Sequence, residues 1–200
     1  MADPKQLAQT LQGEPRFPAL AALCDEFTSA ERLAAIRALG KSELAKLYDL
    51  AAGQPQVALD YLVPADARDG QVPWNGKNSL PMFSHFCKVF ARSDSPEALW
   101  GRNAGSMEWL IGPGYYTCTL RPGHPGEFLI DYTREPPRAP AGWPPIKKNS
   151  AGFSLLVFNN MHDMLRPVGR NVAIGAAYNA TTGSFKNQYF ALARGETIQL

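Results

Sequence analysis

The densest group of side chains able to do chemistry lies in residues 161–170. His162 can donate or accept a proton near neutral pH, and Asp163 follows it directly. Arg166 offers a planar guanidinium that can bind a carboxylate or phosphate through two hydrogen bonds. If the protein is an enzyme, we expect His162 and Asp163 to be catalytic, with Arg166 as the anchor of an anionic group. A solvated turn with surface salt bridges would explain the same residues, and the sequence leaves both interpretations open.

Aromatic residues surround the segments that we expect to be strands. They are Trp74, Trp100, Trp109, Tyr115, Tyr116, Tyr132, Trp143, Tyr178, Tyr189 and Phe190. Such residues form a packed core or the wall of an apolar pocket, in which phenol hydroxyls supply a few hydrogen bonds. A closed barrel can contain both, since its side chains either fill the interior or leave a cavity. The ligand-binding residues that we predict are Arg166, Tyr132, Tyr116, His162, Trp109 and Tyr178.

Better-known kinds of site are not supported by the sequence. Gly76-Lys77 does not belong to a phosphate-binding loop, because the upstream glycine is one position too far away and Asn78 replaces the required Ser or Thr. His85 and Cys87 would share a strand face, but no third metal ligand is placed beside them. The formal charge of +2 gives no electrostatic signature of nucleic acid or anionic membrane. We therefore expect no metal and no nucleic-acid partner.

The composition is that of a folded domain, with 45% apolar and 19% charged residues. The three cysteines are far apart and form no CxxC motif, which favours a reducing compartment such as the cytoplasm. Residues 1–13 contain no apolar leader, and no window approaches the roughly 20 apolar residues of a membrane span. We therefore expect a cytoplasmic location without a membrane span; the oligomeric state stays open.

Helices are predicted near the N-terminus by their start and stop signals. Thr28 and Glu31 have the spacing of a capping box, and the helix that follows would end at Gly40. Ser42 would cap the next helix, and residues 20–27 favour an earlier one. Helices this short are marginal in isolation, so each must bury its apolar stripe against another part of the chain.

The character of the sequence changes after Pro64, where frequent Pro and Gly indicate short elements. The segments predicted as strands are 115–120, 128–132, 153–158, 171–178 and 188–194, while 83–90 fits a strand or a helix. The first two would form a hairpin. Residues 135–145 are too rich in proline to be a central element. No helix of crossover length separates these strands, which argues for an antiparallel sheet.

These patterns predict an α+β fold, with a helical N-terminal segment (1–63) packed on an antiparallel, barrel-like domain (64–200). Phe128, Ile130 and Tyr132 alternate with Leu129 and Asp131, as expected of a strand with two distinct faces. The segment after Arg170 is apolar on both faces. A curled sheet with helices on its outside would cover both of them.

A series of short motifs extends through residues 74–194. It consists of Trp74-Asn75-Gly76-Lys77, Ile130-Asp131-Tyr132, His162-Asp163-Met164-Leu165-Arg166-Pro167-Val168, Ile174-Gly175 and Tyr189-Phe190-Ala191-Leu192-Ala193-Arg194. In this order the motifs resemble the uncharacterised bacterial proteins of the GXWXG/lipocalin-like type, although the GXWXG signature itself is absent. The resemblance implies a calycin-like antiparallel barrel that holds an apolar ligand. Some related barrels bind haem through a histidine, but no motif singles out His162 or His85; we expect no cofactor, with haem as the alternative.

Three functions are compatible with these features. The first is the binding of a lipid-like or other apolar small molecule in a barrel cavity. The second is an isomerase or cyclase that acts on an apolar substrate in the same cavity. The third is a protein-interaction module that docks through the helical N-terminus or the Pro-rich loop at 135–145. A fold of this kind does not by itself decide between binding and chemistry.

Overall fold

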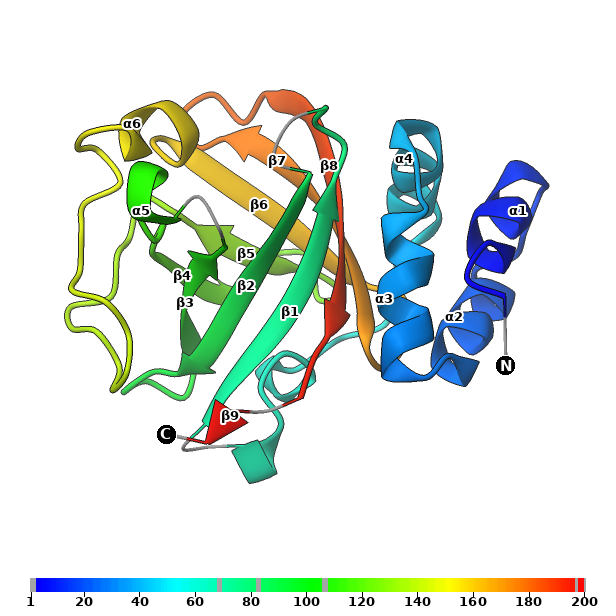
Figure 1. Cartoon of the computed structure of the whole chain (residues 1–200), viewed down its shortest axis with the longest axis horizontal. Helices are drawn as coiled ribbons and strands as arrows, with labels where there is room; N and C mark the ends of the chain where they lie inside the picture. The colour runs from blue at the N-terminus through cyan, green and yellow to red at the C-terminus, as the bar shows by residue number, and fades with distance from the viewer. Residues whose placement is uncertain (1–2, 68–69, 82–83, 106–107, 197, 200) are drawn as a thin grey trace.

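The computed structural model describes residues 3–67, 70–81, 84–105, 108–196 and 198–199, and it shows a β-barrel with helices against one side (Figure 1). The N-terminal helices are α1 (Gln6–Gln12), α2 (Phe17–Glu26), α3 (Ser29–Arg37) and α4 (Lys41–Leu50). Two 3-10 turns follow, η1 (Leu59–Tyr61) and η2 (Ala65–Ala67), and two short helices, α5 (Glu108–Ile111) and α6 (Ser154–Val157), interrupt the strands. Within the described ranges, no helix has the length and apolar character needed to cross a membrane.

The strands form one antiparallel sheet that closes on itself. They are β1 (Gly70–Asn78), β2 (His85–Arg92), β3 (Ala98–Ala104), β4 (Tyr116–Leu120), β5 (Phe128–Asp131), β6 (Met161–Pro167), β7 (Val172–Asn179), β8 (Phe185–Arg194) and β9 (Ile198–Gln199). Each of β2 to β7 pairs with the next strand along the chain, and β1 closes the ring by pairing with both β2 and β8. The short strand β9 pairs with β1. The predicted α+β fold with a curled antiparallel sheet is therefore confirmed.

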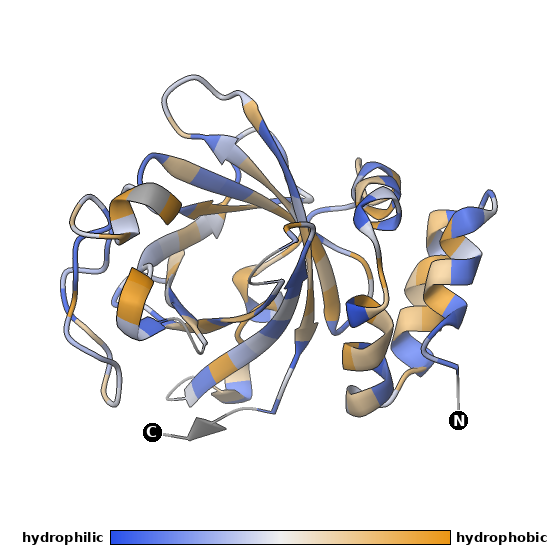
Figure 2. Cartoon of the chain, turned by 45° about the horizontal axis from the view of Figure 1, so that its top comes forward, coloured by the Kyte–Doolittle hydropathy of each residue, from blue (hydrophilic) through white to orange (hydrophobic). Residues whose placement is uncertain are grey.

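The barrel is apolar on its inside and on the part of its outside that the helices cover. Phe128 and Ile130 of β5 belong to the interior core together with Leu165 of β6. Val172 and Ile174 of β7 instead point outward and pack with the buried stripe of the helices. Figure 2 shows the strands as a ring with the helices outside it. This arrangement explains why the sequence of β7 is apolar on both faces.

The N-terminal helices begin largely where their sequence signals predict. Thr28 and Glu31 form the capping box: the Glu31 backbone N–H donates to the Thr28 hydroxyl at 3.3 Å, and the Thr28 backbone N–H donates to the Glu31 carboxylate at 2.9 Å. The prediction for Ser42 was wrong, because Gly40 is the N-cap of α4 and the Ser42 hydroxyl bonds Glu43 instead. Helix α1 was not predicted.

Several strand predictions need correction. Residues 154–157 form helix α6 rather than a strand, and the group at 161–170 lies largely in strand β6 instead of a turn. The reason is that β6 carries an acidic residue, Asp163, on its inner face, which breaks the usual apolar pattern of a strand. Strands β1 and β3 were also missed, since each contains glycine and polar residues. The segment 83–90 forms β2 from His85 onward, and Phe83 lies outside the described residues.

The Pro-rich loop at 135–145 contains no helix or strand, as predicted. Its Trp143 is buried against Tyr115, with the ring centroids 5.9 Å apart, and the Arg102 guanidinium lies 5.5 Å from the Trp143 ring. The Tyr115 hydroxyl also donates to the Pro144 carbonyl. The loop therefore covers part of the barrel exterior with its own tryptophan.

Candidate functional site

One end of the barrel holds a cavity of about 350 Å³, which confirms the predicted interior space. Most of its wall is apolar and comes from residues such as Phe86, Phe158, Met161 and Phe190. Its rim includes the exposed side chain of Leu80, which follows β1. The cavity is thus open to solvent beside Leu80, and most of its wall is apolar.

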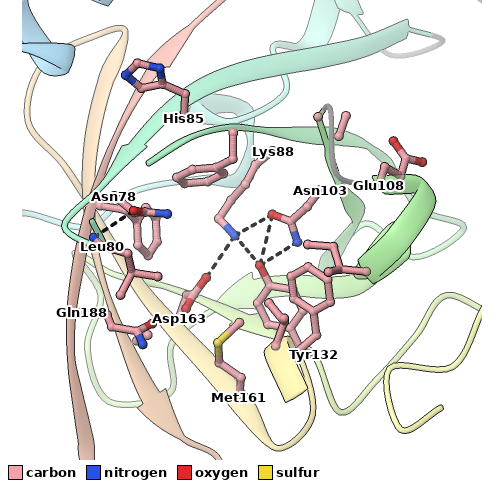
Figure 3. A pocket seen from close by; sticks show the side chains of 18 of the residues that line it. Asn78, Leu80, His85, Lys88, Asn103, Glu108, Tyr132, Met161, Asp163 and Gln188 are labelled. Carbon is pink, nitrogen blue, oxygen red and sulfur yellow. Dashed lines mark hydrogen bonds and ion pairs between the residues drawn. The ribbon is translucent and has the colours of Figure 1, made fainter. Parts of the chain in front are cut away.

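A charged lysine side chain lies inside this apolar cavity. Lys88 of β2 is 2% exposed, and its Nζ lies 3.0 Å from a carboxylate oxygen of Asp163 and 3.2 Å from Asn103 Oδ1. It also donates to the hydroxyl of Tyr132, which accepts a further bond from Asn103 Nδ2 at 3.1 Å (Figure 3). These four residues, which we call the lysine cluster, all line the cavity.

The closed barrel brings the lysine cluster together. Lys88 and Asn103 are direct cross-strand partners on β2 and β3. Asp163 lies on β6, which pairs with β5 and β7 and so belongs to another part of the ring. Because inward-facing side chains alternate along every strand, the three point into the same lumen. Tyr132 follows β5 directly and completes the cluster.

Aromatic rings enclose the ammonium group of Lys88. The rings whose centroids lie 5.0–5.5 Å from Nζ belong to Phe86, Tyr116, Tyr132 and Phe190. Ring faces attract a cation electrostatically, but they do not replace the hydrogen bonds that water would give the ammonium group. The Lys88 charge therefore depends on Asp163 for compensation, and the lysine cluster as a whole is an ion pair with two neutral hydrogen-bonding partners.

Burial controls the protonation of the lysine cluster. It lowers the pKa of the Lys88 ammonium from its ordinary value, and the adjacent Asp163 carboxylate opposes this shift without cancelling it. Burial also raises the pKa of the Tyr132 hydroxyl well above its usual value, an effect that the Asp163 charge reinforces. Tyr132 is consequently a neutral hydrogen-bonding group, while Lys88 is a weaker base than an exposed lysine, and its ammonium loses a proton more readily.

The structure separates the residues that the sequence analysis grouped together. Asp163 and Tyr132 line the cavity, and Tyr116 is buried beneath them with its ring against Lys88. His162 points outward from β6, where its Nε2 lies 3.1 Å from Asp131. Tyr178 packs on the barrel exterior near helix α4. Its hydroxyl lies 3.4 Å from that of Tyr48.

Trp109 and Arg166 also lie away from the cavity. Trp109 is 77% exposed on α5, whose Leu110 and Ile111 line the cavity instead.

No protein-family model matches the chain, and no curated protein matches it significantly. Among the described residues, no group of three or more His, Cys, Asp or Glu side chains could hold a metal ion. The cavity and the lysine cluster are therefore the features from which a function can be inferred.

Arg166 fastens helix α4 to the outside of the barrel. Its Nε donates to Glu127 at 2.8 Å, its Nη1 donates to the Tyr48 carbonyl at 2.7 Å, and the guanidinium lies 3.8 Å from the Tyr48 ring centroid. Burial alone would raise the pKa of the Glu127 carboxyl, but hydrogen bonds from Arg121 and Arg166 lower it overall. These contacts replace the anion-anchoring role that we predicted for Arg166 with a structural one.

We expect Arg166→Met to reduce the free energy of unfolding by about 2 kcal/mol at neutral pH, because charge-assisted hydrogen bonds are lost. The depressed pKa of Glu127 means that its contribution is present above the unfolded-state pKa of about 4.3 and is lost as pH falls through the folded value. In urea unfolding, the difference between wild type and variant should therefore shrink as the pH is lowered below about 4.3, through the depressed folded-state pKa of Glu127. A difference that is unchanged or larger at acid pH would contradict this account.

Two members of the lysine cluster were missed by the sequence analysis. Lys88 lies between Phe86 and Phe90 at period-two spacing, so a lysine occupies the middle of an inward apolar stripe. That position is the signal that could have identified it, because lysine is almost never fully buried unless it is paired. Asn103 lies two residues after Gly101 on β3 and carries no comparable signal.

Proposed function

We propose that this barrel binds a small, mostly apolar molecule whose neutral polar group, a carbonyl or hydroxyl, lies against the lysine cluster. The observation that carries the proposal is a charge-balanced polar cluster buried within an apolar cavity. Small-ligand sites characteristically combine an apolar wall with a few convergent polar groups, and volumes of about 300–1,000 Å³ are usual for them. The cavity of about 350 Å³ is at the small end of that range.

A neutral ligand suits the cavity better than an anion does. Asp163 already balances the charge of Lys88, so a bound carboxylate would leave the cavity with a net negative charge. The attraction of a carboxylate to Lys88 is opposed by its repulsion from Asp163, while its cost of leaving water remains. A carbonyl oxygen, in contrast, can accept a hydrogen bond from Tyr132 or Lys88 without adding charge.

We also propose that the chain is related to the lipocalin-like proteins and that it works in the cytoplasm. A barrel that holds an apolar cavity is what the lipocalin-like resemblance implies, and we retain that resemblance as part of the proposal. The free thiols of Cys24, Cys87 and Cys118 support a reducing, cytoplasmic location. Burial raises the pKa of the Cys24 thiol to about 12, which keeps it unreactive toward oxidants.

The ligand preference can be tested with Prodan, a neutral naphthyl ketone dye whose emission reports an apolar environment. We expect Prodan to bind the full-length protein and to be displaced by methyl octyl ketone at about tenfold lower concentration than by decanoate, which has the same chain length. Equal displacement by both, or a preference for decanoate, would contradict the neutral-ligand proposal.

The site can be tested with a variant that fills the cavity. Ala177 of β7 lines the cavity and is buried, so Ala177→Phe should occupy ligand space and weaken Prodan binding by tenfold or more. Ala52→Phe, at an exposed position after α4, is the matched control and should bind Prodan as wild type does. If both variants bind Prodan equally well, the cavity is not the binding site.

A further inference from the structure

We infer that Lys88 forms a reversible imine with an aldehyde or ketone carbonyl of the molecule in the cavity. This inference rests on the proposed function and specifies it: the ligand class becomes carbonyl compounds, and binding becomes covalent. Among the described lysines, Lys88 is the one that lines the cavity. Its neighbours supply the other groups that imine formation requires.

The first requirement is an amine nucleophile within a bound ligand's reach. Lys88 Nζ faces the cavity and is surrounded by aromatic rings, which exclude bulk water from the amine. Burial lowers the pKa of the Lys88 ammonium and so favours the free amine, the nucleophilic form. A lysine in an apolar site is a recurrent way of making this side chain nucleophilic near neutral pH.

The second requirement is a route for protons. Asp163, 3.0 Å from Nζ, can take the proton that the ammonium must lose. The free amine then attacks the carbonyl carbon; a C–N bond forms, and a proton moves from nitrogen to oxygen to give a carbinolamine. Loss of the hydroxyl with one proton releases water and leaves a C=N bond. When Asp163 returns its proton, the product is an iminium ion paired with a carboxylate, and nothing is oxidised or reduced.

The third requirement is a group that orients and polarises the carbonyl. The Tyr132 hydroxyl lies beside Nζ and stays protonated, because burial raises its pKa. Asn103 fixes this hydroxyl through a 3.1 Å hydrogen bond, and its Nδ2 also donates to the Gly114 carbonyl at 3.1 Å. The phenol can therefore donate to the carbonyl oxygen and later to the departing hydroxyl.

The test is reductive trapping with decanal and cyanoborohydride, which converts an imine into a stable secondary amine. After limited reaction of the full-length protein, peptide mapping should find the decyl group on Lys88 at least about tenfold faster than on the exposed Lys147, because the bound aldehyde is held beside the amine. Decanol, which has the same chain but no carbonyl, should suppress labelling of Lys88 and leave that of Lys147 unchanged.

A variant and a binding measurement separate the outcomes. Lys88→Met/Asp163→Leu removes the amine together with its partner. This double variant should lose the fast labelling that belongs to Lys88 and keep the slower labelling of Lys147. Prodan displacement by decanal without an adduct on Lys88 would overturn the imine inference and leave the proposed function intact. Failure of decanal, decanol and methyl octyl ketone to displace Prodan would overturn both. Equal labelling rates at Lys88 and Lys147 would also overturn the imine inference.

Discussion

Asp163→Asn is expected to lower the free energy of unfolding by about 3–5 kcal/mol at neutral pH, because it leaves the Lys88 ammonium buried without a counter-charge. Lys88 is 2% exposed, and its remaining partners, Asn103 and Tyr132, are neutral. Asparagine has nearly the same shape as aspartate, so the loss would report charge rather than packing. Urea unfolding followed by circular dichroism gives the free energies.

The double variant Lys88→Met/Asp163→Leu is the control for this prediction. It replaces the buried ion pair by apolar side chains, and the cavity beside Asp163 leaves space for the larger leucine, so its stability should lie within about 1 kcal/mol of wild type or above it. A double-mutant cycle built from Lys88→Met, Asp163→Leu and the double variant should accordingly give a coupling energy at the upper end of the usual range of about 0.5–3 kcal/mol. If Asp163→Asn costs less than about 1 kcal/mol, the pair is not held in a dry interior and the description of the lysine cluster is wrong.

Gly101→Ala is expected to destabilise the barrel by about 3 kcal/mol, at the upper end of the usual cost of overpacking. A Cβ at Gly101 would lie 1.9 Å from the Tyr116 ring. Tyr116 cannot move aside easily, because it is fully buried between Phe90 and Tyr132, with ring centroids 5.5 and 5.2 Å away. Glycine is thus required at Gly101 by the ring that lies across it.

Gly13→Ala is the matched control for Gly101→Ala. Gly13 caps helix α1 with a φ of −84°, and a Cβ there would meet only ordinary contact, 3.6 Å from the Thr10 carbonyl oxygen. We expect this change to alter the unfolding free energy by less than about 0.5 kcal/mol. Similar losses for the two alanine variants would show that the Tyr116 ring does not constrain Gly101.

The sequence predicted the parts of the fold that depend on local patterns. The capping box of Thr28 and Glu31, and the hairpin of β4 and β5, follow from signals within a few residues. Strand β6 was missed because its inner face carries Asp163. Had it been identified, its period of two would have placed Asp163 on one face and both His162 and Arg166 on the other.

The candidate site depended on contacts between distant parts of the chain. Asp163 and Lys88 are 75 positions apart in the numbering, and they meet only because the sheet closes into a barrel. The sequence indicated an interior cavity with Tyr132 on its wall, but it did not show that β2 and β6 face each other across the barrel. Arg166 was chosen for its guanidinium, although its partners Glu127 and Tyr48 lie on the barrel exterior.

The central claim, that the barrel interior binds a small, mostly apolar molecule with a neutral polar group, is tested most directly by amide chemical shifts during a titration with methyl octyl ketone. The account predicts saturable changes concentrated around the cavity, including Lys88, Asn103 and Asp163, with little change along helices α1 to α4. In Ala177→Phe these changes should be absent. Saturable changes confined to the helices, or equal changes in wild type and Ala177→Phe, would contradict it.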